Sequence, residues 1–169
     1  DGLRIYTTID SRMQQYAEEA VSEHMQELQK SFFREKRRKS YAPFSQDLTP
    51  EDIDAIMNRS MRQTDRYRAL KKQGLSETEI KKSFNTPVAM RVFSYNGLID
   101  TTMTPMDSIK WNKHFLRCGF MSMDAHSGAV KAYVVGTNFT HFQYDMVTSG
   151  RRQVGSTIKP YLFTLAMDE

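Results

Sequence analysis

One uninterrupted helical pattern constrains the fold of this chain more than any other feature of its sequence. Asp10 is a good N-cap residue, and the basic run that ends near Lys39 suits a helix C-terminus. Pro43 opposes continuation. The pattern predicts one amphipathic helix of about 28 residues, roughly 42 Å long. Between these limits, apolar residues recur every three or four positions without proline or glycine, at Met13, Tyr16, Ala17, Ala20, Val21, Met25, Leu28 and Phe32.

Strand patterns lie on both sides of this helix. Residues 3–9 alternate apolar and polar side chains, which predicts a half-buried strand. Asn96-Gly97 is a strong hairpin turn signal, and the segment around Gly128 reads as a second turn, in which His126 is a turn residue rather than a catalytic base. The strands that flank these two turns are expected at 88–95, 98–103, 119–124 and 129–135.

Start signals predict further helices in the middle of the chain. Thr49-Pro50 offers a capping hydroxyl and a proline at the first helical position, and Thr104-Pro105 repeats this signal. Ser76 and Glu79 have the spacing of a capping box. One helix is expected to begin at residue 50, and a second to contain Tyr67 and Leu70 and to stop at Gly74. A third is expected at 77–84. A fourth is expected to begin at 105, with Trp111 as a core anchor.

These patterns together predict an α+β fold in three parts. Residues 1–40 form a linker strand and the long helix, and residues 41–118 form a pedestal of helices and a β-hairpin. Residues 119–169 hold a strand pair, a long loop at 136–150 and a final helix. A hydrophobic content of 39% and a charged content of 26% are typical of soluble globular proteins.

Composition excludes several functional classes. The net charge is +4, but the basic clusters at 34–39 and 59–72 lack the aromatic context of nucleic-acid binding, so solvated helix faces are favoured over a membrane-surface or anionic-glycan site. No metal-ligand spacing, phosphate loop or membrane-spanning apolar run is present. The single cysteine, Cys118, excludes an internal disulfide. We therefore expect no metal, no cofactor and no nucleic-acid partner.

The chemistry is concentrated in a Ser-x-x-Lys tetrad, Ser156 to Lys159. If a helix starts near Ser156, the two side chains lie on one face, and the Lys159 amine can take the serine proton. An ordinary lysine amine, with a pKa of about 10.4, is protonated at pH 7, so such a base needs desolvation or a second cation. Pro160 lacks an N–H, so the Ser156 carbonyl loses its i+4 donor and the turn should be distorted.

The residues around the tetrad resemble a known family. The run Arg152-Gln153-Val154-Gly155-Ser156-Thr157-Ile158-Lys159-Pro160 resembles the nucleophile segment of class A penicillin-binding proteins, the bifunctional peptidoglycan synthases. Residues 2–10 resemble the linker into the transpeptidase domain of this family, and residues 120–136 resemble its first strand pair. The resemblance is loose between about residues 41 and 118.

This resemblance implies a fold, an activity and partners. The fold would be the start of a penicillin-binding transpeptidase domain, which is serine β-lactamase-like, truncated after its Ser-x-x-Lys helix. Ser156 and Lys159 would be the catalytic residues of D,D-transpeptidation, with peptidoglycan stem peptides, β-lactam antibiotics and other cell-wall synthesis proteins as partners on the periplasmic side of the inner membrane. The second and third family motifs follow the nucleophile, and only ten residues follow Lys159. The chain is therefore expected to be an inactive fragment of an anchored parent, and its substrate-binding residues stay unidentified.

Other functions use the same tetrad or none of it. A β-lactamase or D,D-carboxypeptidase would hydrolyse the acyl-enzyme, and a β-lactam sensor would keep it. A non-catalytic pedestal or interaction module would use the middle segment as its contact surface. The strand and long helix ahead of residue 120 favour the synthase over the hydrolases.

Overall fold

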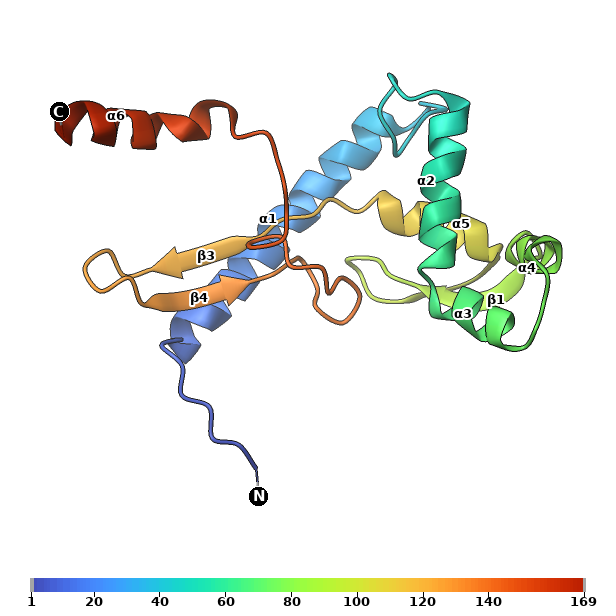
Figure 1. Ribbon diagram of the computed structural model, residues 1–169, viewed down its shortest axis with the longest axis horizontal. Coiled ribbons are helices and arrows are strands. Elements are labelled where there is room, and N and C mark those ends of the chain that lie inside the picture. The colour runs from blue at the N-terminus through green and yellow to red at the C-terminus, as the bar shows by residue number, and fades with distance from the viewer. Residues whose placement is uncertain (1, 169) are drawn as a thin grey trace. The chain divides into compact units, whose positions relative to one another are not determined.

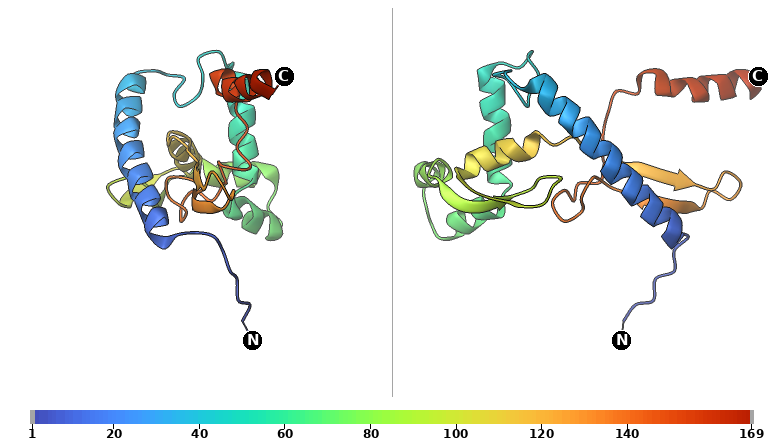
Figure 2. Two further views of the ribbon diagram at one scale, coloured as in Figure 1. Left: turned by 90° about the vertical axis from the view of Figure 1, so that its left-hand side faces the viewer. Right: turned by 180° about the vertical axis from the view of Figure 1, so that it is seen from behind.

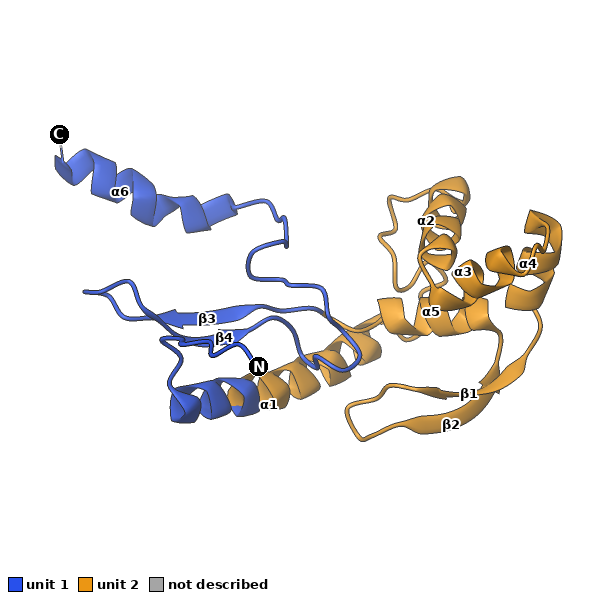
Figure 3. Cartoon of the chain, turned by 60° about the horizontal axis from the view of Figure 1, so that its bottom comes forward, with its two compact units in different colours: residues 1–19, 117–169 blue, residues 20–116 orange. Residues whose placement is uncertain are grey.

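A computed structural model describes residues 2–168 of the chain. Helices and two small antiparallel sheets alternate along it (Figures 1 and 2), which confirms the predicted α+β class. Contacts group the chain into two compact units, which we describe separately: unit 1 holds residues 1–19 and 117–169, and unit 2 holds residues 20–116 (Figure 3). The three-part division expected from the sequence stays a prediction.

The predicted helices all form, with bounds close to those expected. The long helix α1 covers Ser11–Lys36, with 26 residues in place of about 28. It begins after Asp10, whose carboxylate accepts the backbone N–H groups of Arg12 and Met13. The other helices of unit 2 are α2 (Pro50–Arg62), α3 (Asp65–Lys72), α4 (Glu77–Phe84) and α5 (Pro105–Lys113).

Side-chain caps fix the starts of the shorter helices. Ser76 with Glu79 forms the predicted capping box at α4, and Thr49, predicted as a capping hydroxyl, forms a second complete box with Asp52 at α2. The Thr104 hydroxyl caps α5 by accepting the backbone N–H of Asp107. Each cap satisfies backbone donors that a helix start leaves unpaired, which explains why short helices form at these residues.

The core of unit 2 is built where α2, α4 and α5 meet. Met61, Ile80 and Phe84 are almost fully buried, and five partly buried side chains pack around them. These five come mainly from α3 and α5: Tyr67, Leu70, Leu75, Met106 and Ile109. Burial of this apolar face, rather than helix propensity, holds together helices as short as eight residues.

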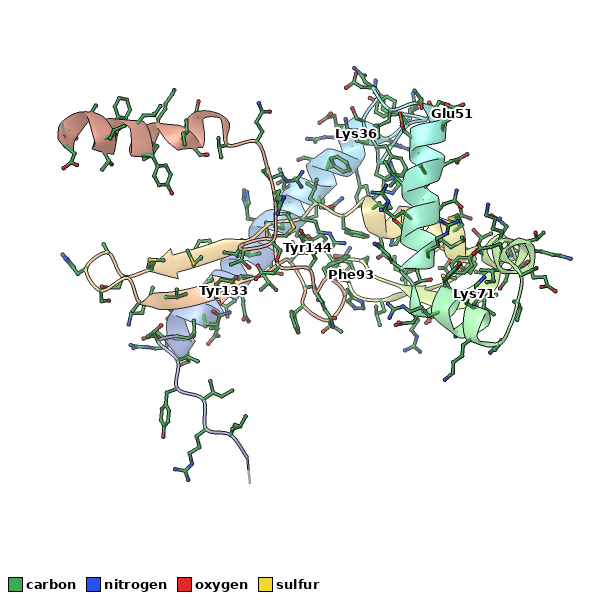
Figure 4. The ribbon with its side chains drawn as sticks, in the orientation of Figure 1. Lys36, Glu51, Lys71, Phe93, Tyr133 and Tyr144 are labelled. Atoms are coloured by element: carbon green, nitrogen blue, oxygen red, sulfur yellow. The ribbon has the colours of Figure 1, made fainter. Side chains whose placement is uncertain are left out.

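An aromatic cluster forms a second packing centre in unit 2. The hairpin of β1 (Val88–Val92) and β2 (Ile99–Met103) carries Phe93 at the end of β1 (Figure 4). Phe93 and Phe115 pack edge to face at 5.0 Å, and Phe33 of α1 stacks with Trp111 at 6.0 Å. The Trp111 indole also donates to the Phe93 carbonyl at 2.8 Å, so this half-buried ring is anchored in the aromatic cluster.

Gln29 joins α1 to the chain that leaves α5. Its side chain is 2% exposed, and its amide makes two bonds to the backbone. The Nε2 group donates to the His114 carbonyl at 2.9 Å, and Oε1 accepts the Leu116 N–H at 2.8 Å. One side chain therefore satisfies two backbone groups that no helix or strand pairs.

In unit 1, β3 (Phe120–Met123) pairs antiparallel with β4 (Val130–Val134), as predicted. A register shift occurs between Ser122 and Met123. The Asp124 carboxylate closes the turn by accepting from the backbone of His126 and from the backbone and hydroxyl of Ser127. His126 is thus a turn residue, as expected.

The predicted strand at 3–9 is wrong. Leu3 and Ile5 are 93% and 80% exposed, and the segment has no ladder. Only its end touches β4: the Thr8 hydroxyl donates to the Val130 carbonyl at 2.6 Å, and the Asp10 N–H donates to the Lys131 carbonyl at 3.0 Å. An alternating pattern indicates only that a segment can form a strand if a partner strand is available. No described strand runs beside residues 2–7 to form hydrogen bonds with them.

Just after this contact, Gln14 extends β4 with a side chain. Its Oε1 accepts the Tyr133 N–H at 2.8 Å, and its Nε2 donates to the Tyr133 carbonyl at 3.1 Å. The amide therefore takes the place of one residue of a neighbouring strand, and it ties the first turns of α1 to the sheet.

Candidate active site

The loop at 136–150, which leads toward the tetrad, is held by one carboxylate. Asp145 Oδ2 accepts the Tyr133 hydroxyl at 2.6 Å and the Thr148 hydroxyl at 2.7 Å, while Oδ1 accepts the Val147 N–H at 2.8 Å. Tyr133 lies on β4, and Tyr144 lies within the loop (Figure 4), where its hydroxyl donates to the Ser149 carbonyl at 2.6 Å. The loop is ordered by local bonds up to Gly150.

These bonds change the acidity of both partners. Donation from Tyr133 and Thr148 stabilises the charged carboxylate and lowers the pKa of Asp145 from 3.8 to about 2. The same bond to Asp145 raises the pKa of the Tyr133 hydroxyl, because the neutral phenol is the donor. At neutral pH the loop is therefore held by an ionised acid and a protonated phenol.

Two glycines let the backbone pass closely at Met146. A Cβ on Gly119 would lie 2.8 Å from the Met146 carbonyl carbon, and a Cβ on Gly150 would lie 2.6 Å from its carbonyl oxygen. Both distances are shorter than side-chain carbons tolerate. The loop can therefore fold against the start of β3 only with glycine at these two positions.

The tetrad itself adopts a tight turn. Gly155 has φ +51°, a left-handed conformation that glycine adopts without strain. The 3₁₀ helix η1 follows over Gly155–Ile158, and the helix α6 covers Lys159–Asp168. The Ser156 carbonyl accepts the Lys159 N–H, the i+3 pairing of a 3₁₀ turn. Because Pro160 has no N–H to offer as i+4 donor, this is the distortion that the sequence predicted.

The turn brings the two tetrad residues to one side of the chain. In a 3₁₀ helix the side chains at i and i+3 eclipse each other, so the turn from Ser156 to Lys159, the first residue of α6, favours a common direction for the two side chains. Both are exposed, and among residues 2–168 neither the serine hydroxyl nor the lysine amine has a hydrogen-bond partner. The backbone thus aligns the pair, whereas the proton transfer expected from the sequence stays a prediction.

Comparison with known proteins identifies the family. The pattern described as the penicillin-binding protein middle domain matches residues 39–116, which lie within unit 2. Penicillin-binding protein 1A of Vibrio cholerae is 42% identical over 50 residues, which cover 30% of this chain and 6% of that protein. Penicillin-binding protein 1A of Escherichia coli is 24% identical over 208 aligned positions, which cover 100% of this chain and 23% of that protein.

The chain contains a penicillin-binding protein middle domain, and the relatives that it matches are penicillin-binding proteins. Both of these relatives are of the 1A type, which supports the resemblance to class A. The chain spans at most about a quarter of the length of these relatives. No solved structure matches it.

The helix that carries the tetrad lysine is apolar and uncovered in this penicillin-binding protein chain. None of the described side chains of α6 is buried, although the helix is apolar around its circumference. Such helices are normally buried in a protein core. Its large apolar side chains are all more than half exposed: Tyr161, Leu162, Phe163, Leu165 and Met167.

Three segments resemble the second and third family motifs by letter, and each has a local structural role. Ser83-Phe84-Asn85 is the end of α4, with Asn85 as its C-cap. Ser94-Tyr95-Asn96 is the β1–β2 turn, and His126-Ser127-Gly128 is the β3–β4 turn. The second and third of these segments lie at the two turns that the sequence predicted around Asn96-Gly97 and Gly128.

The described residues do not meet the requirements of a metal site or of a membrane-spanning helix. Residues 2–168 contain no group of three His, Cys, Asp or Glu side chains that could hold a metal ion. Within the same range, no helix has both the length and the apolar content needed to cross a membrane. Cys118 is half-buried, and burial raises the pKa of its thiol.

The contacts of Asp145 with Tyr133 and Thr148 were not found from the sequence. Asp145-Met146-Val147-Thr148 has a local signal, because an aspartate often accepts from the backbone two and three residues later. The bond from Tyr133 has no such signal, since it joins residues 12 positions apart across a loop.

Proposed function

We propose that this chain is part of a peptidoglycan synthase that cross-links stem peptides by D,D-transpeptidation through an acyl-enzyme on Ser156. The observation that carries the proposal is the η1 turn, which sets Ser156 and Lys159 in one direction within a chain of the penicillin-binding family. The activity belongs to the whole protein, of which this chain is a small share by comparison with its relatives.

The proposed reaction has two steps. Ser156 Oγ attacks the carbonyl carbon between the two terminal D-alanines of a donor stem peptide while Lys159 takes the hydroxyl proton. The peptide C–N bond breaks, the proton passes to the leaving nitrogen, and D-alanine departs. An amine of a neighbouring stem peptide then attacks the ester, loses its proton to the lysine, and releases the serine with its hydroxyl restored.

The exposure of the tetrad supports the proposal that the reaction needs more of the protein than this chain. A lysine amine acts as a base only where desolvation or another cation disfavours its charged form, and Lys159 is in water here. The Ser156 N–H would be one oxyanion donor, and a second donor must come from beyond the described residues. The reaction uses only protein groups, so the proposal includes no cofactor.

The other proposed partners follow from the same acyl-enzyme chemistry on Ser156 and from where its substrate lies. A β-lactam ring carries a strained amide that Ser156 would open in the same way, which leaves the drug on the serine. Stem peptides of peptidoglycan are extracytoplasmic, so we place the working protein on the periplasmic side of the inner membrane. Other cell-wall synthesis proteins are proposed as partners in the same compartment.

The test uses the full natural protein that contains this chain, with fluorescent penicillin as the probe. Ser156→Ala should abolish labelling, and Lys159→Ala should slow it by at least about 10²-fold. Ser149→Ala is the matched control, because only the backbone of that residue is bonded in the described structure. Normal labelling of the Ser156 variant would end the proposal.

A second candidate is a non-catalytic interaction module, which the position of the family match within unit 2 favours for the chain by itself. Incubation of the 169-residue chain with penicillin, followed by mass spectrometry, distinguishes the two for this segment. We expect no adduct. A stoichiometric adduct on Ser156 would show that the exposed tetrad is already competent.

A further inference from the structure

Unit 2 contains a small hollow between α1, the β1–β2 turn and α5. Its volume is about 140 Å³. Phe33 of α1 lines one side, Trp111 of α5 and Phe115 just after α5 line another, and Ser94 and Asn96 of the turn complete the lining. A dry cavity of about 150 Å³ holds one benzene ring, so this hollow has room for one phenyl or branched aliphatic group.

Three polar side chains that line the hollow, those of Gln29, Gln26 and Ser94, already make hydrogen bonds. Gln29 bonds to the His114 carbonyl and the Leu116 N–H, and the Gln26 amide donates to Asn96 Oδ1 at 3.2 Å. The Ser94 hydroxyl donates to the Gly97 carbonyl at 2.7 Å.

The indole of Trp111 is bonded to the Phe93 carbonyl in the same way. A sugar ring would bring hydroxyls that compete for these paired groups, whereas an apolar side chain needs only the ring faces. The hollow is therefore suited to an apolar anchor.

The rim of the hollow is basic along α1. Lys30 lines it and pairs with Glu27 at 2.6 Å. Arg34 lies one turn further on the same side of the helix, and Arg37 follows directly after the helix ends. Among the described residues, neither arginine forms an ion pair. Neither arginine lines the hollow itself, but by helical spacing Arg34 follows Lys30 and Arg37 follows Phe33 by about one turn, and both lack carboxylate partners among the described residues.

We propose that this hollow binds a partner polypeptide through one aromatic or leucine-sized anchor flanked by acidic residues. The aromatic walls take the anchor, and Arg34 and Arg37 attract the flanking carboxylates. A lipid chain fits less well, because it needs an extended groove and the hollow accepts a single side chain. The site lies apart from the tetrad in the sequence and does not depend on acylation of Ser156.

Trp111 is the only tryptophan of the chain, so its fluorescence reports directly on the hollow. The probe is a synthetic peptide with one phenylalanine between glutamates, added to the 169-residue chain. The Trp111 emission should change with peptide concentration until it saturates, and added salt should weaken the binding of the peptide. A peptide with alanine in place of phenylalanine should have no effect, and one with lysines in place of glutamates should bind at least about tenfold more weakly.

Variants test the two halves of the site separately. Arg34→Glu with Arg37→Glu should weaken binding about tenfold. Arg59→Glu with Lys72→Glu, which changes the net charge equally on α2 and α3, should leave binding unchanged. Gln26→Phe places a ring at the mouth and should abolish the response. Circular dichroism checks folding, and the three peptides on the unaltered chain test the proposal even if a variant fails to fold.

Several results would overturn the proposal. One is the absence of any response to the phenylalanine peptide, and another is an equal response to the alanine peptide, which would show charge attraction alone. A larger response to phosphatidylglycerol vesicles would assign the surface to a membrane. A change of Trp111 emission with the concentration of the chain by itself would assign it to a second copy.

Discussion

Replacing Gln29 with methionine should lower the free energy of unfolding of unit 2 by about 2–4 kcal/mol. Methionine has nearly the same volume, so the change creates little cavity and removes only the two amide bonds. It leaves the His114 carbonyl and the Leu116 N–H without partners beneath a side chain that is 2% exposed.

The magnitude follows from the cost of leaving buried backbone groups unpaired. Each such group costs about 1–3 kcal/mol, and two of them give about 2–6 kcal/mol. His114 and Leu116 are themselves only half-buried, so water can reach them after a small movement, which favours the lower part of this range.

Gln14 offers a matched control on the same helix. Its amide makes the same pair of bonds, to the backbone of Tyr133, but it lies in unit 1 and is more exposed than Gln29. Gln14→Met should therefore change the stability of unit 2 by less than about 1 kcal/mol.

The assay is urea unfolding followed by Trp111 fluorescence, because this residue lies in unit 2. For a slope of roughly 2 kcal/mol/M, Gln29→Met should lower the midpoint by about 1–2 M without changing the slope. The control should lower it by less than about 0.5 M. Equal shifts for the two variants would refute the argument that burial sets the cost.

Three further outcomes follow from the described contacts. The pKa of Asp145 is depressed to about 2, so its bonds to the loop are complete above pH 3.8 and are lost as the pH falls toward 2; the exchange rate of the Thr148 amide should rise over that window and should show no such step in Asp145→Asn. Ser76→Ala removes the capping box of α4 and should cost about 1 kcal/mol in urea unfolding, whereas Thr78→Ala on the same helix should cost almost nothing. In dilute solution the amides of α6 should exchange far faster than those of β4, because α6 buries no side chain, and strong protection of α6 in a monomer would contradict this.

Local signals predicted the elements of this fold well. Thr49-Pro50, Ser76 with Glu79 and Asn96-Gly97 each fix their own backbone with a nearby side chain or a permissive glycine, so their sequence contains the whole cause. The distortion at Ser156 was predicted for the same reason, since Pro160 removes one particular donor.

Features that depend on distant partners were not predicted. The alternation at 3–9 needs a neighbouring strand, which the described residues do not provide, and Gln29 finds its two partners 85 and 87 residues away. The anchoring of the loop by Tyr133 has the same character. Of the candidate site, the direction of Ser156 and Lys159 could be derived from the sequence, but the groups that would surround them could not.

The proline after the tetrad has a consequence for the angle between its two functional residues. Three residues of an α-helix turn through about 300°, which would leave the serine and the lysine about 60° apart around the axis. Three residues of a 3₁₀ turn complete about 360°, so the two vectors coincide. Pro160 therefore determines the angle of the Lys159 side chain around the helix axis relative to Ser156, although it is neither of the two functional residues. Restoring an N–H at that position, as in Pro160→Ala, would let the turn relax and rotate the amine away from the hydroxyl while leaving both residues in place.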